Sequence, residues 1–497
     1  MSGKMVMRCS ENLNGLFASF IFVGLALCAE NGRAAVPFSL QGPGVNPAHF
    51  RVTEFATGLN YPVGMAELPD GSILVTSTDG PGYFTSNARL LRLRDADQNG
   101  VADGPPTVLF NGLSGGITSV RIGGNLVFVA GQSRPIYVLR MGATPADPFS
   151  EVGRLTITYP AGGWMHPHSA LMVRPTPGQA RSYDLLFQLG SKSNFTATTQ
   201  TASLATTGLG GFAGVMRGDS IYQLTFVDDG AAVVATNLLQ IASGLRNPSG
   251  FAFHPVTGDL YFEDNGIDGL VDPNEPHSAD ELNVVPASAV GDSGASGAPF
   301  YGFPANYTAY RTGTVVGGQG IQPLVAFQPL PNPMTGAESE GPNDIAFSPP
   351  AFPPSLDGGV FVTFHGKFGN GGLNNEENPL VFVNLKTTNY FHVIAPRLPG
   401  VGHLDGLLTT RDSLFVSDIS TNGSLSNGAG RGVVYQIKAL VGPPVTARWV
   451  GSEIELDWTE GMLQGSSNVS GGWIDVTNVS PYRTEPTELR RFFRTRN

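Results

Sequence analysis

The stretch GLRNPSGFAFHPVTGDLYFEDNG, from Gly244 to Gly266, combines the features that decide the fold of this chain. An Arg-Asn-Pro turn leads into an apolar segment, a Pro/Gly turn follows, and a second alternating segment ends at a carboxylate beside a glycine. Short alternating segments around tight turns predict antiparallel strands. The stretch therefore predicts a β-hairpin, and its recurrence along the chain decides the architecture.

The same phrase recurs throughout the chain. Each copy has a first strand of about five residues, a turn rich in Pro, Gly or Asp, and a second alternating strand, and most copies precede a third apolar strand. The copies begin at Gly58, Gly112, His166, Gly244, Gly341 and Gly400. Six antiparallel units with no helical period between them predict an all-β six-bladed β-propeller over 48–440. A large sandwich is the structural alternative, but a sandwich requires no such recurrence.

Two segments depart from the repeat. Residues 268–310 form a long insertion in the fourth unit, and their aromatic and acidic side chains favour an ordered and functional segment. A Pro-containing linker at 441–446 precedes short alternating segments that predict a small C-terminal β module over 446–497. Attachment, sorting or packing are the roles that we expect for this module.

The composition fits a strand-rich protein and excludes some partners. The 497 residues include 65 Gly and 38 Pro with 41% apolar residues, as expected for many tight turns between short strands. Only 14% of the residues are charged, and the net charge is −11. This balance argues against nucleic-acid binding and against binding to anionic membranes, because both need basic patches.

The N-terminal 1–35 segment is typical of an export signal. Basic residues precede an apolar run of 14 residues, Leu16–Ala29, which is short for a membrane span, and small residues follow it. An uncleaved anchor is the alternative. Both cysteines, Cys9 and Cys28, lie in or beside this run. We therefore expect a periplasmic or extracellular protein without a stable membrane span, disulfides or cysteine-held metal in its mature form.

Several phrases together resemble one known family. The opening stretch is followed in order by DELN (Asp280–Asn283), YGFP (Tyr301–Pro304) and FVTFHGKF (Phe361–Phe368). This order resembles the soluble quinoprotein glucose/sorbosone dehydrogenases over residues 50–440. The resemblance implies a six-bladed propeller that holds pyrroloquinoline quinone (PQQ) over Ca²⁺. It also implies an exported dehydrogenase that oxidises a sugar, or a related alcohol or aldehyde, by hydride transfer to the quinone. No CxxCH motif is present, so a separate electron acceptor is expected.

The quinone sets physical demands that three residues are candidates to meet. PQQ carries three carboxylates on a planar ring, so its site needs cations and hydrogen-bond donors. The resemblance implies that Arg246 and Asn247 contact the quinone, although Arg246 is alternatively a guanidinium that stabilises the turn through backbone carbonyls. Lys367 is a candidate to neutralise a PQQ carboxylate, and the alternative for it is a solvated surface lysine.

Calcium needs six to eight oxygen ligands. The resemblance implies that the backbone carbonyls of Gly266 and Ile267 hold the ion beside the quinone. It assigns Asp280 and Glu281 to a second, structural calcium region. A carboxylate that caps a loop is the alternative for Glu281.

A separate acidic loop, DADQNGVAD, has the start of an EF-hand pattern. Asp95, Asp97 and Asn99 alternate, Gly100 permits a sharp turn, and Asp103 closes the loop, but the twelfth position is not Glu. The pattern predicts a calcium-stiffened turn between blades one and two. A solvated turn rich in Asp and Asn is the alternative.

Hydride abstraction also needs a base for the substrate hydroxyl proton, and histidine suits that role. His166 falls where the family places its catalytic histidine relative to the following strand. His168 lies two residues on, on the same face of an extended segment, and is the competing candidate. A structural imidazole with both nitrogens satisfied is the alternative reading of either residue.

Departures from the family pattern keep two other functions open. Met165 stands where an Asp often precedes the histidine, and His403 and Asp405 stand where an arginine commonly opens the last blade. A calcium-dependent propeller hydrolase of the lactonase type would need carboxylates at the inner strands, and only Asp344 and Asp405 qualify. A non-catalytic propeller that binds a carbohydrate or a protein is the third possibility.

Overall fold

The computed structural model describes residues 35–85, 87–272, 274–292, 297–440, 445–458, 461–467, 473–485 and 491–496. The chain divides into two compact units, Met1–Ala35 and Val36–Asn497. The predicted export signal, with both cysteines, lies outside the described residues except for Ala35. No helix in the described ranges is long and apolar enough to cross a bilayer.

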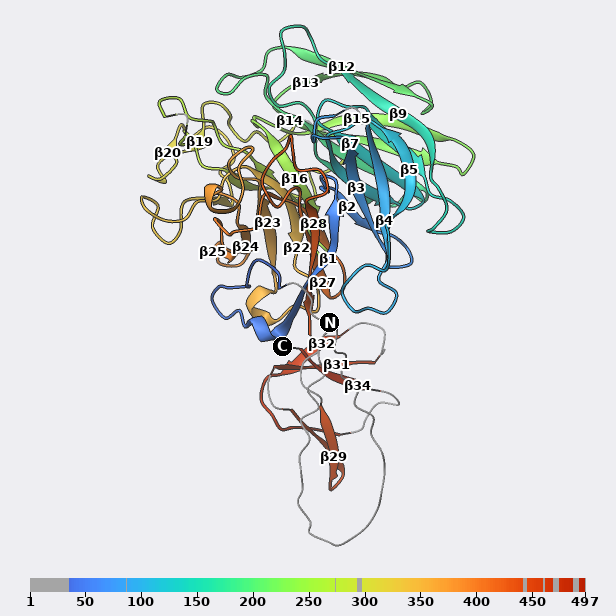
Figure 1. The fold of residues 1–497 in the computed structure, drawn as a ribbon, viewed down its shortest axis with the longest axis vertical. Helices are drawn as coiled ribbons and strands as arrows, with labels where there is room; N and C mark the ends of the chain where they lie inside the picture. The colour runs from blue at the N-terminus through green and yellow to red at the C-terminus, as the bar shows by residue number, and fades with distance from the viewer. Residues whose placement is uncertain are drawn as a thin grey trace, which may run out of the picture. The chain divides into compact units, whose positions relative to one another are not determined.

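Six antiparallel sheets confirm the predicted six-bladed propeller (Figure 1). Every predicted hairpin supplies the innermost strand of one sheet. These strands are β2 (Met65–Glu67), β6 (Ile117–Gly123), β10 (Leu171–Pro175), β16 (Pro248–Phe253), β22 (Pro342–Phe347) and β26 (Leu404–Thr409). Each innermost strand contacts the next in this order, and β26 contacts β2, so the six strands close a ring.

The other strands of each blade follow outward in sequence order, apart from the last blade. Blade 1 adds β3 (Ile73–Asp79), β4 (Asn87–Leu93) and β5 (Thr107–Leu113). Blade 2 adds β7 (Leu126–Gly131), β8 (Ile136–Arg140) and β9 (Ser150–Thr158). Blade 3 adds β11 (Ser182–Leu189), β14 (Ser220–Asp228) and β15 (Val233–Ser243). Blade 4 adds β17 (Leu260–Asp264), β18 (Glu281–Val285) and β21 (Val325–Ala326); blade 5 adds β23 (Gly359–Phe364), β24 (Leu380–Asn384) and β25 (Tyr390–Ile394).

The last blade joins the two ends of the propeller sequence. Strands β27 (Ser413–Asp418) and β28 (Gly432–Ala439) extend outward from β26, and the outermost strand is β1 (Phe50–Leu59). Strand β1 runs antiparallel to β28, with Phe50 opposite Ala439. This pairing closes the ring with backbone hydrogen bonds between the two ends of the propeller sequence.

The hairpin phrase does not predict every strand. Residues 268–310, expected to be an insertion, contain β18, the third strand of blade 4, and the start of a small ribbon of β19 (Tyr307–Thr308) and β20 (Val315–Val316). A second hairpin, β12 (Thr201–Thr207) and β13 (Ala213–Arg217), leaves blade 3 and pairs with β9 of blade 2. Such pairing depends on a partner strand far away in the sequence, and local alternation carries no information about it.

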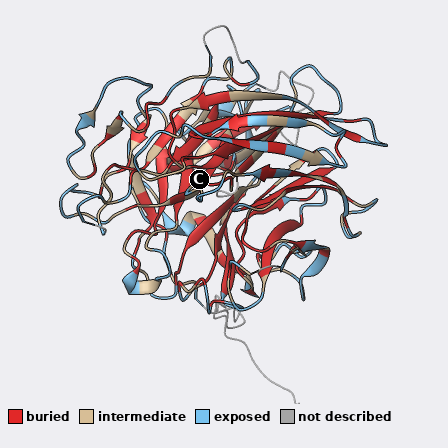
Figure 2. Ribbon diagram, turned by 90° about the horizontal axis from the view of Figure 1, so that it is seen from above, coloured by how far each residue is buried: buried red, intermediate tan, exposed pale blue. Residues whose placement is uncertain are grey.

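Aromatic and aliphatic side chains fill the space between neighbouring blades. Figure 2 shows buried positions running along the strands, with exposed positions concentrated in loops and edges. Between blades 3 and 4, for example, Phe251 and Phe262 are both fully buried, and the rings of Phe262 and Tyr301 meet edge to face at 5.3 Å. Burial of each such ring stabilises the fold by about 1.5–3 kcal/mol. This packing holds the blade ends, from which the candidate site residues project.

The C-terminal β module is also confirmed. One sheet contains β29 (Thr446–Val450), β30 (Glu453–Asp457) and β33 (Tyr482–Thr484), and the other contains β31 (Met462–Ser466), β32 (Ile474–Thr477) and β34 (Phe492–Arg496). Leu456, Trp458 and Leu463 form its small buried core.

Candidate functional site

The candidate residues of blades 3 and 4 come from one end of the propeller. His166 and His168 precede the inner strand β10, and Arg246 and Asn247 precede the inner strand β16. Gly266 follows the second strand of its blade, β17. The start of an inner strand and the end of its antiparallel partner lie at the same end of a hairpin. We refer to this end of the propeller as the mouth.

Asp264, the last residue of β17, holds the Arg-Asn-Pro turn in place. Its two carboxylate oxygens accept hydrogen bonds from the backbone amides of Arg246 (2.9 Å) and Asn247 (2.6 Å). Burial raises the pKa of Asp264 to about 7, although these two bonds act in the opposite direction. Sequence analysis did not assign a role to Asp264, although the "ED" at the end of the second strand marked its position.

The guanidinium of Arg246 is buried and has several partners. It donates to Asn194 Oδ1 (2.9 Å) and to the backbone carbonyl of Asn265 (3.3 Å), and its Nη2 lies 2.6 Å from Asp268 Oδ2. Arg246 is 3% exposed, whereas the Asp268 side chain is 59% exposed. The guanidinium therefore bonds to residues of two neighbouring loops, and its charge partner is an exposed carboxylate.

His166 has an unsatisfied ring nitrogen. Its Nε2 is buried and has no hydrogen-bond partner among the described residues, while its backbone amide donates to Ser191 O (3.0 Å). Burial, assisted by the positive charge of Arg246, lowers the pKa of His166 to about 3. The imidazole is therefore neutral at physiological pH, with a nitrogen that a ligand can engage.

His168 is held in a different way. Its Nδ1 lies 2.6 Å from the Tyr159 hydroxyl, and its Nε2 lies 2.5 Å from the carbonyl of Arg134. The side chain is 1% exposed, and burial lowers its pKa to about 4. Both ring nitrogens are used within the protein, so the geometry assigns His168 a structural role and leaves His166 as the histidine available to a ligand.

The two predicted carbonyl ligands of calcium differ in availability. The carbonyl of Gly266 accepts no hydrogen bond from the described residues, whereas that of Ile267 accepts bonds from the amides of His277 (2.7 Å) and Ser278 (3.3 Å). An added Cβ at Gly266 would lie 2.3 Å from the Ser278 carbonyl, so only glycine fits there. Of this pair, only the Gly266 carbonyl has both lone pairs free of backbone bonds.

Asp280 and Glu281, assigned to the second calcium region, have distinct surroundings. Asp280 accepts hydrogen bonds from the amides of Gly266 (2.6 Å) and Gly341 (2.8 Å), so it caps two loops and ties blade 4 to blade 5. Glu281 accepts one bond from Asn283 (3.1 Å). Burial, followed by the charge of Asp264, raises the pKa of Glu281 to about 8.

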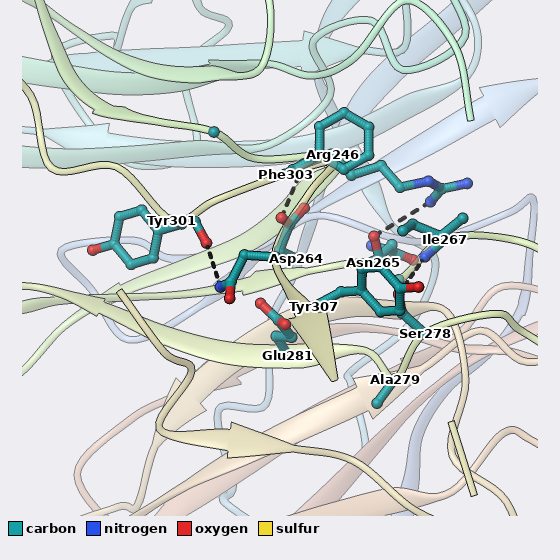
Figure 3. A pocket seen from close by; sticks show the side chains of 13 residues that line it. Arg246, Asp264, Asn265, Ile267, Ser278, Ala279, Glu281, Tyr301, Phe303 and Tyr307 are labelled. Carbon is teal, nitrogen blue, oxygen red and sulfur yellow. Dashed lines mark hydrogen bonds between the residues drawn. The ribbon is translucent and has the colours of Figure 1, made fainter. Parts of the chain in front are cut away.

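Glu281 and Asp264 line a cleft of about 300 Å³, a volume that includes space open to solvent. Figure 3 shows their carboxylates and the Arg246 side chain projecting into this region from separate strands and loops. Asn306, which also lines the cleft, donates from Nδ2 to the Tyr301 carbonyl (3.3 Å). The buried carboxylate of Asp264, the partly buried carboxylate of Glu281 and the nearby free carbonyl of Gly266 are the kind of oxygen donors that calcium prefers.

Lys367 faces carboxylates. Its Nζ lies 3.1 Å from Glu376 and 3.9 Å from Glu377. Side-chain oxygens of Glu338, Glu340 and Glu377 lie within 4.8 Å of one another. An anionic ligand at Lys367 would therefore compete with Glu376 and approach Glu338, whose pKa is lowered, which disfavours a PQQ carboxylate there.

The acidic loop lies elsewhere than predicted. Residues 94–106 join β4 to β5 within blade 1, so the expectation of a turn between blades one and two was wrong, because the fourth strand of the blade was not recognised. Asp95 accepts bonds from the amides of Asn99 (3.0 Å) and Gly100 (2.8 Å), and Asp103 accepts one from Ala96 (2.6 Å). Burial and the neighbouring Asp97 raise the pKa of Asp95, while the two amide bonds oppose this shift.

The two carboxylates considered for a hydrolase already have partners. Asp344 pairs with Arg121 (2.9 Å) and accepts a bond from the amide of Leu407 (3.0 Å). Asp405 pairs with Nδ1 of His365 (2.8 Å), a contact that sequence analysis missed because the two residues lie in different blades. Binding of a single channel ion, as such a hydrolase requires, would compete with these contacts.

Comparison with known proteins supports the fold. No family model matches the chain. The PQQ domain of pyranose dehydrogenase from Coprinopsis cinerea, in its holo form, superimposes with a TM-score of 0.50 at 16% identity, over 82% of this chain and 98% of that domain. The PQQ-bound aldose sugar dehydrogenase from Streptomyces coelicolor gives 0.47 at 17% identity, over 79% of this chain and 99% of that chain.

A comparison with curated proteins adds one short match. An uncharacterized protein from Borreliella burgdorferi is 51% identical over 45 residues, which are 9% of this chain and 11% of that protein. The chain thus spans about a tenth of the length of this relative. The resemblance to PQQ-dependent sugar dehydrogenase propellers is confirmed at the level of the fold, on the structural match alone.

Proposed function

We propose that this chain is an exported PQQ-dependent dehydrogenase that oxidises a sugar, or a related alcohol or aldehyde, and passes the electrons to a separate acceptor. One observation carries the proposal: the buried, unpartnered Nε2 of His166 lies close to the buried cation Arg246 at the mouth of the propeller. A base beside an anion-binding group is the combination that such a reaction needs.

The donor set on the blade 3 and blade 4 side of the mouth fits the quinone. Arg246 supplies a cation, and the side chain of Asn247 has no hydrogen bond to a described residue. The Gly266 carbonyl is a free oxygen donor for calcium, with Glu281 in the adjoining cleft. Lys367 does not fit the role of a quinone ligand, because its ammonium group already pairs with Glu376 and Glu377. We therefore assign the quinone to Arg246 and Asn247, and leave Lys367 out.

When bound, PQQ supplies a carbonyl that accepts hydride, and calcium polarises that carbonyl. The residues of this chain then have separate tasks. His166 is the residue that would accept the hydroxyl proton of the substrate at Nε2. Burial and Arg246 lower its pKa to about 3, and we expect that pKa to rise when an anionic cofactor offsets the charge of Arg246. Arg246 would exchange the exposed carboxylate of Asp268 for an anionic group of the cofactor. Asp264 keeps the turn rigid while this exchange occurs.

Reconstitution of the purified mature protein tests this function. PQQ and calcium would be added, and reduction of an artificial dye would be followed with a panel of aldoses. We expect sugar-dependent turnover in the wild type. His166→Ala should retain PQQ but lose turnover, and His168→Ala, where folded, should keep it. Absence of PQQ binding at saturating calcium would contradict the proposal.

A non-catalytic carbohydrate-binding propeller is the second candidate. The pairing of Lys367 with Glu376, and of Arg246 with Asp268, leaves fewer cations free for a tricarboxylate. Sugar binding without PQQ binding in the same experiment would favour this candidate.

A further inference from the structure

A second histidine at the mouth is oriented by a carboxylate. His365 follows β23 of blade 5, and Asp405 is the second residue of β26 in blade 6. Nδ1 of His365 lies 2.8 Å from Asp405 Oδ1, while Nε2 is buried without a partner among the described residues. With its proton on Nδ1, facing the carboxylate, the imidazole has Nε2 as a hydrogen-bond acceptor.

The surroundings fix this imidazole rigidly. The ring of His403 stacks on it at a centroid distance of 3.9 Å and an angle of 6°. His403 is itself held, with Nδ1 at 2.8 Å from the His365 carbonyl and Nε2 at 2.8 Å from the Gly423 carbonyl. Asn343 donates to the backbone carbonyl of Asp405 (2.7 Å). The free nitrogen is thus presented in one orientation, which is the condition for specific recognition of a donor.

One exposed aromatic ring lies beside the His365 imidazole, and a second exposed ring packs near the first. Phe368, which is 70% exposed, lies 5.9 Å from the His365 ring between centroids. Phe84, which is 50% exposed, comes from the loop between β3 and β4 of blade 1 and stacks near Phe368 at 6.4 Å and 30°. Loops of blades 1 and 5 therefore meet in an apolar surface next to a polar acceptor.

We propose that Phe84, Phe368 and His365 form a binding subsite for a neutral hydroxylated ring, a sugar or a cyclic polyol. The C–H face of the ring lies on the phenylalanines, and one hydroxyl donates to Nε2 of His365. The carboxylate of Asp405, which contacts His365, and the carboxylates near Lys367 disfavour the binding of an anion at this subsite. The inference rests on the proposed function in taking a sugar as substrate, and it names the surface that holds the sugar.

Sugar binding to the cofactor-free full chain tests this subsite. D-Glucose, D-galactose and myo-inositol serve as probes, and binding is followed by nitrogen chemical shifts of labelled histidines and by calorimetry. We expect at least one probe to shift Nε2 of His365. Phe368→Ala and His365→Ala should each weaken binding about tenfold. Trp449→Ala removes an exposed ring of the C-terminal module and is the matched control, with no expected effect.

The outcomes separate this inference from the proposed dehydrogenase. If sugar changes the His365 nitrogen chemical shift in a protein that does not bind PQQ, the result supports the subsite and contradicts the dehydrogenase proposal. A PQQ-loaded enzyme that turns over sugars with an unchanged KM in Phe368→Ala and His365→Ala overturns the subsite alone. Absence of binding for all three probes at tens of millimolar also overturns it. Phe368 is largely exposed, so loss of folding does not confuse its result.

Discussion

The two histidine pairs at the mouth are built alike but differ in their charged neighbour. In each pair one imidazole is satisfied by the protein. His168 contacts the Tyr159 hydroxyl and the Arg134 carbonyl, and His403 contacts the Gly423 carbonyl through Nε2 and Asn375 Nδ2 through Nδ1. The other member, His166 or His365, keeps a buried Nε2 without a partner among the described residues. The satisfied ring fixes the local structure, and the unsatisfied ring is left for a ligand.

The charged neighbours suggest different ligands on the two sides. Arg246 stands beside His166, and its positive charge helps to lower the pKa of that ring. Asp405 bonds directly to Nδ1 of His365. A cation beside a neutral imidazole suits an anionic cofactor, whereas a carboxylate behind an imidazole suits a hydroxyl donor. On our two proposals, the mouth has a cofactor side around Arg246 and a sugar side around His365.

The largest expected effect concerns His166. In the reconstituted enzyme, His166→Ala should lower kcat by about 10²–10⁴-fold, the usual range for loss of a general base. His166→Gln keeps a polar side chain and serves as the control for packing, and it should be almost as inactive. Dye reduction under saturating sugar measures both. Turnover within a factor of ten of the wild type in both variants would remove His166 from the reaction.

Substitution of His168, the structural member of this pair, should lower the stability of the protein. His168→Ala loses two buried hydrogen bonds and leaves a cavity, so the free energy of unfolding should fall by about 2–4 kcal/mol. Urea denaturation measures this loss, and His166→Ala should show a smaller one on the same scale. Equal losses of unfolding free energy in the two variants would contradict the assignment of the structural role to His168 alone.

The cofactor side should also show a pH signature through Glu281. Its pKa is raised to about 8 in the fold, from about 4.3 in the unfolded chain, so folding favours the protonated form. The stability that it contributes is complete below about pH 4 and is lost as the pH rises through about 8. In chelator, Glu281→Gln should be more stable than the wild type by about 1–4 kcal/mol at about pH 8.

Unfolding midpoints from pH 5 to pH 9, with and without calcium, check this expectation. Glu453→Gln, in the C-terminal module, is the control. Calcium should restore the stability of the wild type at high pH, and it should do so less in Glu281→Gln. A wild type whose stability does not fall with rising pH would argue against a buried protonated Glu281.

The smallest effect is expected away from the mouth, at the acidic loop of blade 1. If Asp95 and Asp97 hold calcium, saturating calcium should raise Tm by about 1–3 °C through this loop. The double variant Asp95→Asn, Asp97→Asn should lose that increment while keeping the response of the mouth. A calcium shift identical in wild type and double variant would leave the loop as an Asx-rich turn.

Local patterns predicted the blades, and long-range pairing explains what they missed. The hairpin phrase located all six inner strands, because alternation and turn residues are encoded within about twenty residues. Strand β18 escaped because the 265–280 loop separates it from its partner β17, and the hairpin β12–β13 escaped because it joins β9 of the preceding blade. For the site, spacing singled out His166 and His168 but could not tell which ring had partners. The pairing of His365 with Asp405 joins two blades, and no spacing rule predicts it.

Quantitative PQQ binding tests the central claim most directly. Equilibrium dialysis at saturating calcium, with detection of quinone absorbance, would compare wild type, Arg246→Ala and Lys367→Ala. We expect one PQQ for each wild-type chain and loss of most binding in Arg246→Ala. Lys367→Ala should change binding little, because Lys367 forms an ion pair with Glu376. No binding by the wild type, or equal binding by wild type and Arg246→Ala, would contradict the central claim.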